Sequence, residues 1–219
     1  ILKRGKLWAQ MAEDATMFPE TSHIGRALTA EQKTRLFRTA ASRPAWLVAH
    51  CAAVLAVSTT CRKVELRHLR WADVNLFART LRVNRSKTEA GRRTIPLNAD
   101  AIAALGHLRS RAELLGAAEQ EHFVFPACES GRIDPERPQK SWRTAWRNLT
   151  RAADLVGFRF HDLRHTAITE LAETGAADAT LQALAGHLSH KMLEHYSHIR
   201  MEAKRAAVDQ IASGLMGEP

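Results

Sequence analysis

The stretch from Ala45 to Val57 constrains the fold more than any other part of the chain, because apolar residues fill it and only His50 interrupts them. Pro44 precedes it, and proline is favoured at the first position of a helix. The run is shorter than the roughly 18 residues that a membrane-spanning helix requires. It therefore predicts a helix that ends near Thr59 and is buried inside a core, and it argues against membrane insertion.

Helical patterns dominate the rest of the chain, and only one pair of strands stands out. Thr29 and Gln32 have the spacing of a capping box, which predicts that a helix begins there. Residues 80–84 and 93–97 read as strands joined by a polar connection that contains Gly91, which predicts an antiparallel hairpin. Prolines at positions 126, 135 and 138 predict a long loop, and glycines at 157, 175 and 186 predict short helices in the last third. The expected fold class is mainly α with one small antiparallel β-sheet (α+β).

A break in the pattern near residue 25 divides the chain. Apolar residues recur every four positions between residues 7 and 15, as at the end of an amphipathic helix, and Pro19 and Gly25 then interrupt the pattern. We expect residues 1–25 to be the end of a preceding domain plus a linker, and residues 26–219 to be the main domain.

The composition favours a polyanionic partner in a reducing compartment. Lysine and arginine number 32 against 23 Asp and Glu, which gives a net charge of +9 and favours nucleic acid, although a merely basic soluble protein has the same excess. Three scattered cysteines (Cys51, Cys61 and Cys128) fit a cytosol and argue against a disulfide framework and a cysteine zinc site. The chain begins at Ile1 without a signal-peptide pattern, so we expect a fragment that is not secreted.

Histidines crowd the C-terminal part of the chain, where six of the eleven lie between residues 161 and 198. His161 and His165 stand at i, i+4, but Asp162 occupies the position that carries glutamate in a zinc-protease helix, and Arg164 argues against a cation there. His161 and Arg164 lie on one helical face and can converge on one phosphate. Taken alone, such a pair is more often a surface histidine beside a salt-bridged arginine.

Two further candidates lie downstream of this pair. Tyr196 is the only tyrosine beside twelve Phe and Trp residues, which indicates that its hydroxyl is used. The structural alternative is a tyrosine that bridges core and solvent. His187 follows Gly186 and lies nine residues before Tyr196.

The upstream candidates are mostly basic. Arg62 and Glu65 follow the apolar helix at i, i+3, where a local ion pair is the simpler interpretation. Lys87 lies in the connection of the predicted hairpin, where residues that only touch phosphate would also be basic. The other basic residues of this connection are Arg85, Arg92 and Arg93.

Together these residues resemble the tyrosine recombinase (phage integrase) family. The family order of Arg, Lys, His-x-x-Arg, Gly-His and Tyr is complete at Arg62, Lys87, His161, Arg164, His187 and Tyr196. The flanking segments are also similar, among them Ser86-Lys-Thr, His161-Asp-Leu-Arg-His-Thr and Leu184-Ala-Gly-His-Leu. The resemblance covers about residues 26–213, and it departs at Thr60-Cys61, where the family often has glycine and an apolar residue.

The resemblance implies a tyrosine recombinase catalytic domain that acts as a site-specific DNA recombinase without ATP, metal or another cofactor. Tyr196 would attack a phosphodiester and form a covalent 3′-phosphotyrosyl intermediate. Arg62, Arg164 and His187 would stabilise the transition state, and Glu65 would orient these cations. His161 would assist proton transfer at Tyr196, and Lys87 would protonate the leaving 5′-oxygen. The residues that would contact DNA are Arg85, Lys87, Arg92 and Arg93.

The resemblance also implies partners and a location. We expect double-stranded DNA, no membrane, a cytoplasmic and nucleoid-associated location, and self-association on DNA in a tetrameric synapse. The C-terminal helix would mediate this association through an apolar stripe of Val208, Ile211 and Leu215. Residues 1 to about 20 would be the last helix of an N-terminal core-binding domain.

Two alternatives stay open. A type IB topoisomerase-like enzyme uses similar tyrosine chemistry, although the Gly-His and Ser-Lys-Thr segments are more similar to recombinases. A decayed integrase or a helix-turn-helix regulator would only bind DNA. The second alternative predicts the loss of at least one catalytic residue, and none is lost.

Overall fold

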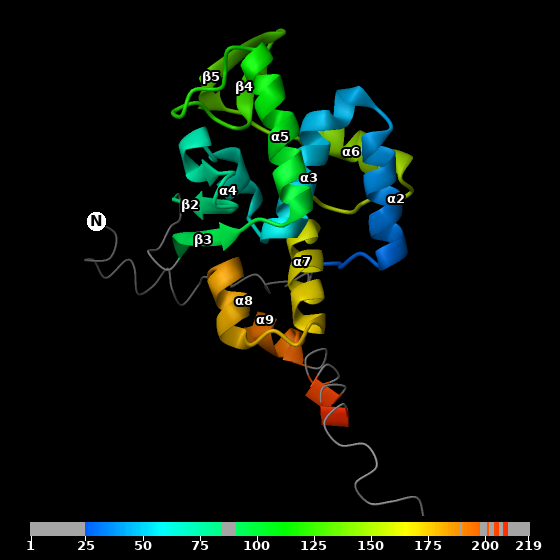
Figure 1. Cartoon of the computed structure of the whole chain (residues 1–219). Helices are drawn as coiled ribbons and strands as arrows, with labels where there is room; N and C mark the ends of the chain where they lie inside the picture. Colours follow the sequence, from blue (N-terminus) through cyan, green and yellow to red (C-terminus); the bar gives the residue numbers. More distant parts are fainter. Residues whose placement is uncertain are drawn as a thin grey trace, which may run out of the picture.

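The computed structural model describes residues 25–84, 91–188, 190–197, 201, 204–205 and 208–209, which are mainly helical (Figure 1). The helices are α2 (Ala30–Ala41), α3 (Leu47–Thr59), α4 (Lys63–Arg67), α5 (Ala99–Leu114), α6 (Arg143–Ala152), α7 (Asp162–Glu173), α8 (Asp178–Ala185) and α9 (His190–His195), with short 3-10 turns at Pro44–Trp46 and Trp71–Asp73. The strands are β1 (Val74–Asn75), β2 (Thr80–Val83), β3 (Arg93–Pro96), β4 (Pro126–Glu129) and β5 (Arg132–Pro138). Mainly α structure with small antiparallel sheets confirms the expected fold class.

The predicted apolar helix is α3, and it lies in the middle of the molecule with α2, α5 and α7 packed around it (Figure 1). Leu55 and Ala52 are fully buried, as expected for a helix that is apolar on all sides. The predicted capping box also forms, since the Thr29 hydroxyl accepts a hydrogen bond from the Gln32 amide at 3.2 Å and the Gln32 side chain accepts one from the Thr29 amide. The apolar run thus predicts α3 correctly, and the capping box correctly predicts the start of α2.

Among the described residues, a single pair of helices, sharply bent between its two members, has the combined length and apolar composition of a membrane span. In the described part of the chain, no single helix is long and apolar enough to cross a bilayer. The pair formed by Ala30–Ala41 and Pro44–Thr59 passes by length and composition only when taken together, with a bend of 113°.

The predicted hairpin is formed by β2 and β3, which pair antiparallel with Leu81 opposite Ile95. Both of these side chains are buried, so this face of the sheet joins the core. The short strand β1 adds to the other edge of β2 and gives the order β1-β2-β3. The connecting residues 85–90 lie outside the described residues.

The expectation of a long loop across the prolines at 126, 135 and 138 is wrong, because β4 and β5 form a second antiparallel hairpin there. Ser130 and Gly131 make its two-residue turn with φ values of 50° and 78°, a left-handed pair that suits the twist of a hairpin. Each strand of a two-stranded sheet has a free edge, so proline, which cannot donate a ladder hydrogen bond, is tolerated.

Two clusters of buried residues hold the structure together. The larger one surrounds α3 and includes side chains from α2, α5, α6 and the sheet. The smaller one joins α7, α8 and α9 and consists of Ile168, Ala172, Leu181, Ala185, Leu188 and Tyr196. The candidate nucleophile thus belongs to the smaller cluster. The interpretation of residues 1–24 as a helix and linker lies outside the described residues.

Candidate active site

The site begins where α3 ends. Thr60 has φ 54° and ψ 11°, a left-handed conformation that costs a non-glycine residue roughly 1–2 kcal/mol. The Thr60 hydroxyl donates to the carbonyl oxygen of Leu184 at 2.9 Å, and the Thr60 carbonyl accepts a hydrogen bond from Arg164. The side chain and backbone of Thr60, where the sequence departs from the resembled family, therefore tie the end of α3 to two other elements of the site.

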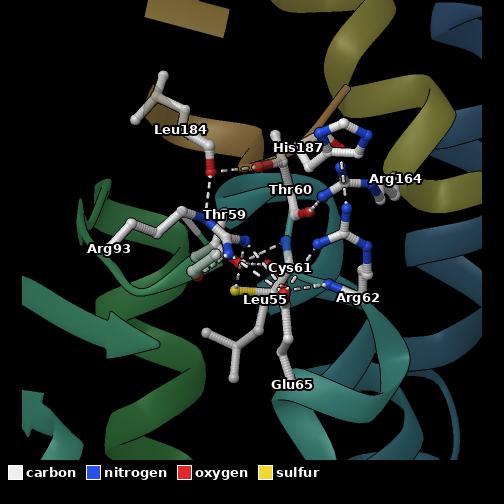
Figure 2. Close-up of polar contacts among 11 residues, drawn as sticks. Leu55, Thr59, Thr60, Cys61, Arg62, Glu65, Arg93, Arg164, Leu184 and His187 are labelled. Atoms are coloured by element: carbon white, nitrogen blue, oxygen red, sulfur yellow. Dashed lines mark hydrogen bonds and ion pairs between the residues drawn. The ribbon is translucent and has the colours of Figure 1, made fainter. Parts of the chain in front are cut away.

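A buried carboxylate, that of Glu65, organises the arginines (Figure 2). Its Oε1 lies 3.0 Å from Nη1 of Arg62, its Oε2 lies 2.9 Å from Nη2 of Arg93, and Oε2 also accepts the Arg62 backbone amide at 2.7 Å. Burial alone would raise the pKa of Glu65, but the hydrogen bonds from Arg93 and Arg62 outweigh it and hold the pKa below its usual value. Glu65 is thus ionised at neutral pH and orients both guanidinium groups.

Arg93 points inward from β3. Its side chain is only 6% exposed, its Nε donates to the Leu184 carbonyl at 2.7 Å, and Nη1 donates to the Gly91 carbonyl at 3.0 Å. The expectation that Arg93 contacts DNA does not fit this geometry, because the side chain instead connects β3, Glu65 and the end of α8. The sequence predicts this orientation, because side chains alternate between the two faces of a strand and Arg93 lies two residues before the buried Ile95.

The other basic residues of the hairpin connection are placed differently. Arg92 is exposed beside β3. Arg85 and Lys87 lie outside the described residues, so their roles remain predictions.

Arg62 and Arg164 come together with His187 at the surface of this network, and Figure 2 shows the three side chains side by side. Nη2 of Arg62 donates to the His187 carbonyl at 2.9 Å, which fixes the position of the exposed histidine. Arg164 is 3% exposed, and burial, followed by the charge of Arg62, lowers the pKa of its guanidinium to about 10. It keeps its positive charge at neutral pH. Two like charges held together in this way favour an anion between or beside them.

Gly186 allows the chain to pass close to the arginines. It has φ 71° and ψ −153°, a conformation that is essentially restricted to glycine. A Cβ atom there would lie 3.2 Å from Nη1 of Arg93 and 3.7 Å from Nη1 of Arg62. The glycine of the Gly-His pair thus admits the close approach, and the histidine that follows lies beside Arg62 and Arg164 (Figure 2).

Helix α7 carries the predicted His-x-x-Arg pair at its N-terminal end. His161 is exposed, and burial of part of its ring together with the charge of Arg164 lowers the pKa of the imidazole. Asp162 between them is buried and ion-paired with Arg159 at 2.7 Å, so it stabilises the start of the helix. Among the residues that the structure describes, no three His, Cys, Asp or Glu side chains are grouped so as to hold a metal ion.

The Tyr196 phenol lies in the smaller core cluster and is only 2% exposed. Nδ1 of His165 lies 3.3 Å from its oxygen. Burial raises the pKa of the phenol, while a side-chain hydrogen bond from Thr169 and the charge of Arg164 oppose that shift. The sequence indicates His165 as a possible metal ligand and as part of the family-like segment that begins at His161, but it assigns no role at Tyr196 to His165 or to Thr169, although both lie at helical spacing after His161.

Comparison with known proteins gives consistent matches. The phage integrase family profile matches residues 26–203. The shufflon-specific DNA recombinase of Escherichia coli is 28% identical over 203 residues, which cover 89% of this chain and 47% of that protein. This chain spans about half the length of the curated relatives it matches.

Solved structures with a similar fold include two integrases with DNA. One is the Tn1549 transposon integrase in complex with circular intermediate DNA, with a TM-score of 0.69, 18% identity, and coverage of 94% of this chain and 76% of that chain. The other is a lambda integrase tetramer bound to a Holliday junction, with a TM-score of 0.56, 26% identity, and coverage of 89% and 56%.

Proposed function

This chain belongs to the phage integrase family, and on that premise we propose that it is the catalytic part of a site-specific DNA recombinase. The observation that carries the proposal is the pair of guanidinium groups, from Arg62 and Arg164, that Glu65 and the Thr60 carbonyl hold beside the exposed His187. Such a group of fixed donors suits the non-bridging oxygens of one phosphodiester and the charge that develops on them during strand transfer.

The proposed reaction exchanges one phosphate ester for another. The Tyr196 oxygen attacks phosphorus, the bond to the 5′-oxygen breaks, and the DNA remains attached to the enzyme as a 3′-phosphotyrosine. The phenol proton leaves with the help of a base, and the 5′-oxygen gains a proton and departs as a hydroxyl. Attack by a 5′-hydroxyl reverses these steps and rejoins a strand. Because the number of phosphoester bonds is unchanged, no ATP is required.

The remaining roles are proposed from the family resemblance and from side-chain chemistry. His187 would donate to the same oxygens as the arginines, and His161 would assist the proton transfer at Tyr196. Lys87 would protonate the 5′-oxygen. Glu65 acts behind the arginines, since it contacts Arg62 and Arg93 rather than a position that a phosphate could occupy.

We further propose that the partner is double-stranded DNA and that copies of the chain assemble on it. The net charge of +9 supports an electrostatic share in binding. DNA contacts are proposed for the exposed Arg92 and for Arg85 and Lys87. For assembly as a tetramer the candidate contact is the C-terminal segment, in which Val208 is 60% exposed and Ile211 and Leu215 lie outside the described residues.

We extend the proposal to the organisation of the chain and to its location. Residues 1–25 are proposed to be the end of an N-terminal core-binding domain plus a linker, and residues 26–219 to be the catalytic domain. The protein would act in the cytoplasm, at the nucleoid.

The test uses a nicked duplex that carries the recombination site, taken from attachment-like repeats that flank the gene. Loss of the short strand downstream of the cut prevents rejoining, so a covalent protein–DNA complex should accumulate. Tyr196→Phe should form no complex and should still bind the duplex. A covalent complex with Tyr196→Phe would contradict the mechanism. Relaxation of a plasmid without any such site would instead favour the topoisomerase-like alternative.

A further inference from the structure

Two side chains of α7 act on the Tyr196 oxygen. Nδ1 of His165 lies 3.3 Å from it, and Thr169 supplies a side-chain hydrogen bond. His165 and Thr169 stand at i, i+4 and therefore lie on one face of the helix. The ring of His161, one turn earlier, meets the His165 ring edge-on with centroids 5.3 Å apart. The helix that contributes Arg164 to the anion site thus also holds the oxygen of the nucleophile.

The chemistry of His165 suits a hydrogen-bond partner rather than a charge. Burial, and then the neighbouring His161, lowers the pKa of its imidazole to about 4, so the ring is neutral at physiological pH. A neutral imidazole has one nitrogen that donates and one that accepts. Nδ1 can therefore accept a hydrogen bond from the phenol, and in the other tautomer it can donate one to the phenolate.

The orientation of the His165 ring is fixed from its other side by the segment that leads into α2. A Cβ atom built on Gly25 would lie 1.8 Å from Cδ2 of His165, so the backbone at this glycine packs directly on the ring. The same segment is anchored to α7, because the buried Leu28 amide donates to the Thr166 hydroxyl at 3.1 Å. His165 is thus enclosed between the Gly25 backbone and the Tyr196 phenol.

We propose that His165 is a positioning residue for the nucleophile: its Nδ1 holds the Tyr196 oxygen against α7, and the Gly25 backbone keeps the ring in the orientation that this contact needs. The proposal rests on the proposed function, in which Tyr196 is the nucleophile. In this proposal the backbone at Gly25, just before the proposed catalytic domain, influences the position of the Tyr196 oxygen.

The first test compares two substitutions of the same residue. His165→Asn retains a polar atom close to the position of Nδ1, and His165→Phe retains a ring of similar size without the hydrogen bond. Single-turnover cleavage is measured on the nicked duplex at saturating protein, so that DNA affinity does not enter. We expect His165→Phe to cleave about tenfold more slowly or worse, and His165→Asn to remain within about threefold of the unmutated rate.

The second test observes the phenol directly. Tyr196 is the only tyrosine in the chain, so growth on 3-fluorotyrosine places a single ¹⁹F label in the protein, at this residue. His165→Phe should move the ¹⁹F resonance towards that of an exposed tyrosine, and His165→Asn should leave it near its original position. Gly25→Ala should also move it, because the new methyl group displaces the ring. Gly106→Ala is the matched control, since a Cβ there meets nothing within 4 Å.

The outcomes separate this proposal from the proposed function. If Tyr196→Phe still forms a covalent complex, the proposed function fails and the positioning role with it. If Tyr196→Phe is inactive but His165→Phe cleaves at the unmutated rate, only the positioning role is overturned. A slow His165→Phe that His165→Asn fails to rescue overturns it too, because a structural role alone explains that pattern. An unshifted ¹⁹F resonance in Gly25→Ala overturns the part assigned to Gly25.

Discussion

The site consists of two regions that are built in different ways. The arginine region (Arg62, Glu65, Arg93 and Arg164) joins α3, α4, β3 and α7 and is tied to the end of α8 through charged hydrogen bonds to side chains and backbone carbonyls. The tyrosine region consists of His165, Thr169 and Tyr196, of which Tyr196 belongs to the smaller core cluster. Nδ1 of His165 lies 3.3 Å from the phenol oxygen, and Thr169 supplies a side-chain hydrogen bond. The site thus combines a network of buried charges, fixed from several elements, with a candidate nucleophile that lies in the smaller cluster of α7, α8 and α9.

This difference has a functional meaning. Charge stabilisation is most effective when the donors are already in place before the reaction, and the arginine region meets that condition without a ligand. In the proposed reaction the buried Tyr196 oxygen would have to reach a phosphorus atom, and local opening is easier in a small cluster than in the main core.

The largest effect on stability should come from the centre of the arginine region. Glu65→Ala leaves the buried Arg93 guanidinium without its carboxylate, and breaking a buried ion pair from one side costs about 3–5 kcal/mol. Urea unfolding measures the loss. The control is Glu113→Ala, which removes an exposed i, i+4 pair with Arg109 and should cost at most about 0.5 kcal/mol. Equal losses in the two variants would mean that Glu65 does not organise the site.

The largest effect on catalysis should come from Arg164. Arg164→Ala removes a preorganised donor and should slow single-turnover cleavage about 100- to 1,000-fold at saturating protein. Arg164→Lys should recover little of this loss, because a single ammonium cannot reproduce the planar fork or reach the Thr60 carbonyl in the same way. Full activity of Arg164→Lys would mean that the positive charge of Arg164 suffices without the planar guanidinium.

The two regions should also differ in local opening. Backbone amides of α3 belong to the main core, and those of α8 and α9 pack on the smaller cluster. Hydrogen exchange in the free protein should therefore be slower in α3 than in α8 and α9, by roughly tenfold or more. Helix α5, which also packs into the main core, should behave like α3. Equal protection of the α3, α8 and α9 amides from hydrogen exchange would contradict the proposed difference between the two regions.

How much of this contrast could be predicted from the sequence depends on the range of the interactions. The α3 helix, the β2–β3 hairpin and the proximity of His161 to Arg164 follow from short-range spacing, which a single sequence displays. The inward orientation of Arg93 was also encoded, by its alternation with Ile95, but a basic residue beside a basic loop favoured a DNA contact instead. Local spacing thus indicates which residues share a face, and it leaves open whether that face meets solvent.

Tertiary contacts account for the rest. His165 meets Tyr196 across 31 residues, and Leu28 meets Thr166 across 138 residues. No periodicity in the chain predicts which helices pack together at these points. The β4–β5 hairpin differs from the expected loop for another reason: prolines favour loops, whereas the free edges of a two-stranded sheet accept them.

The smallest expected effect is that of chelation. If Arg62, Arg164 and His187 supply the positive charge at the phosphate, EDTA should change the cleavage rate by less than about twofold. The measurement is single-turnover cleavage with EDTA and, as the control, with added Mg²⁺. A strict dependence on Mg²⁺ would assign the charge stabilisation to a metal ion rather than to the arginine region.

In the proposed reaction Tyr196 forms the covalent bond to DNA, and mapping that bond tests this role. The complex trapped on the nicked duplex is digested with nuclease and protease, and the modified peptide is sequenced by mass spectrometry. We predict a nucleotide attached through a 3′-phosphate to Tyr196, the only tyrosine in the chain. A nucleotide attached to any other residue, or through a 5′-phosphate, would contradict the account.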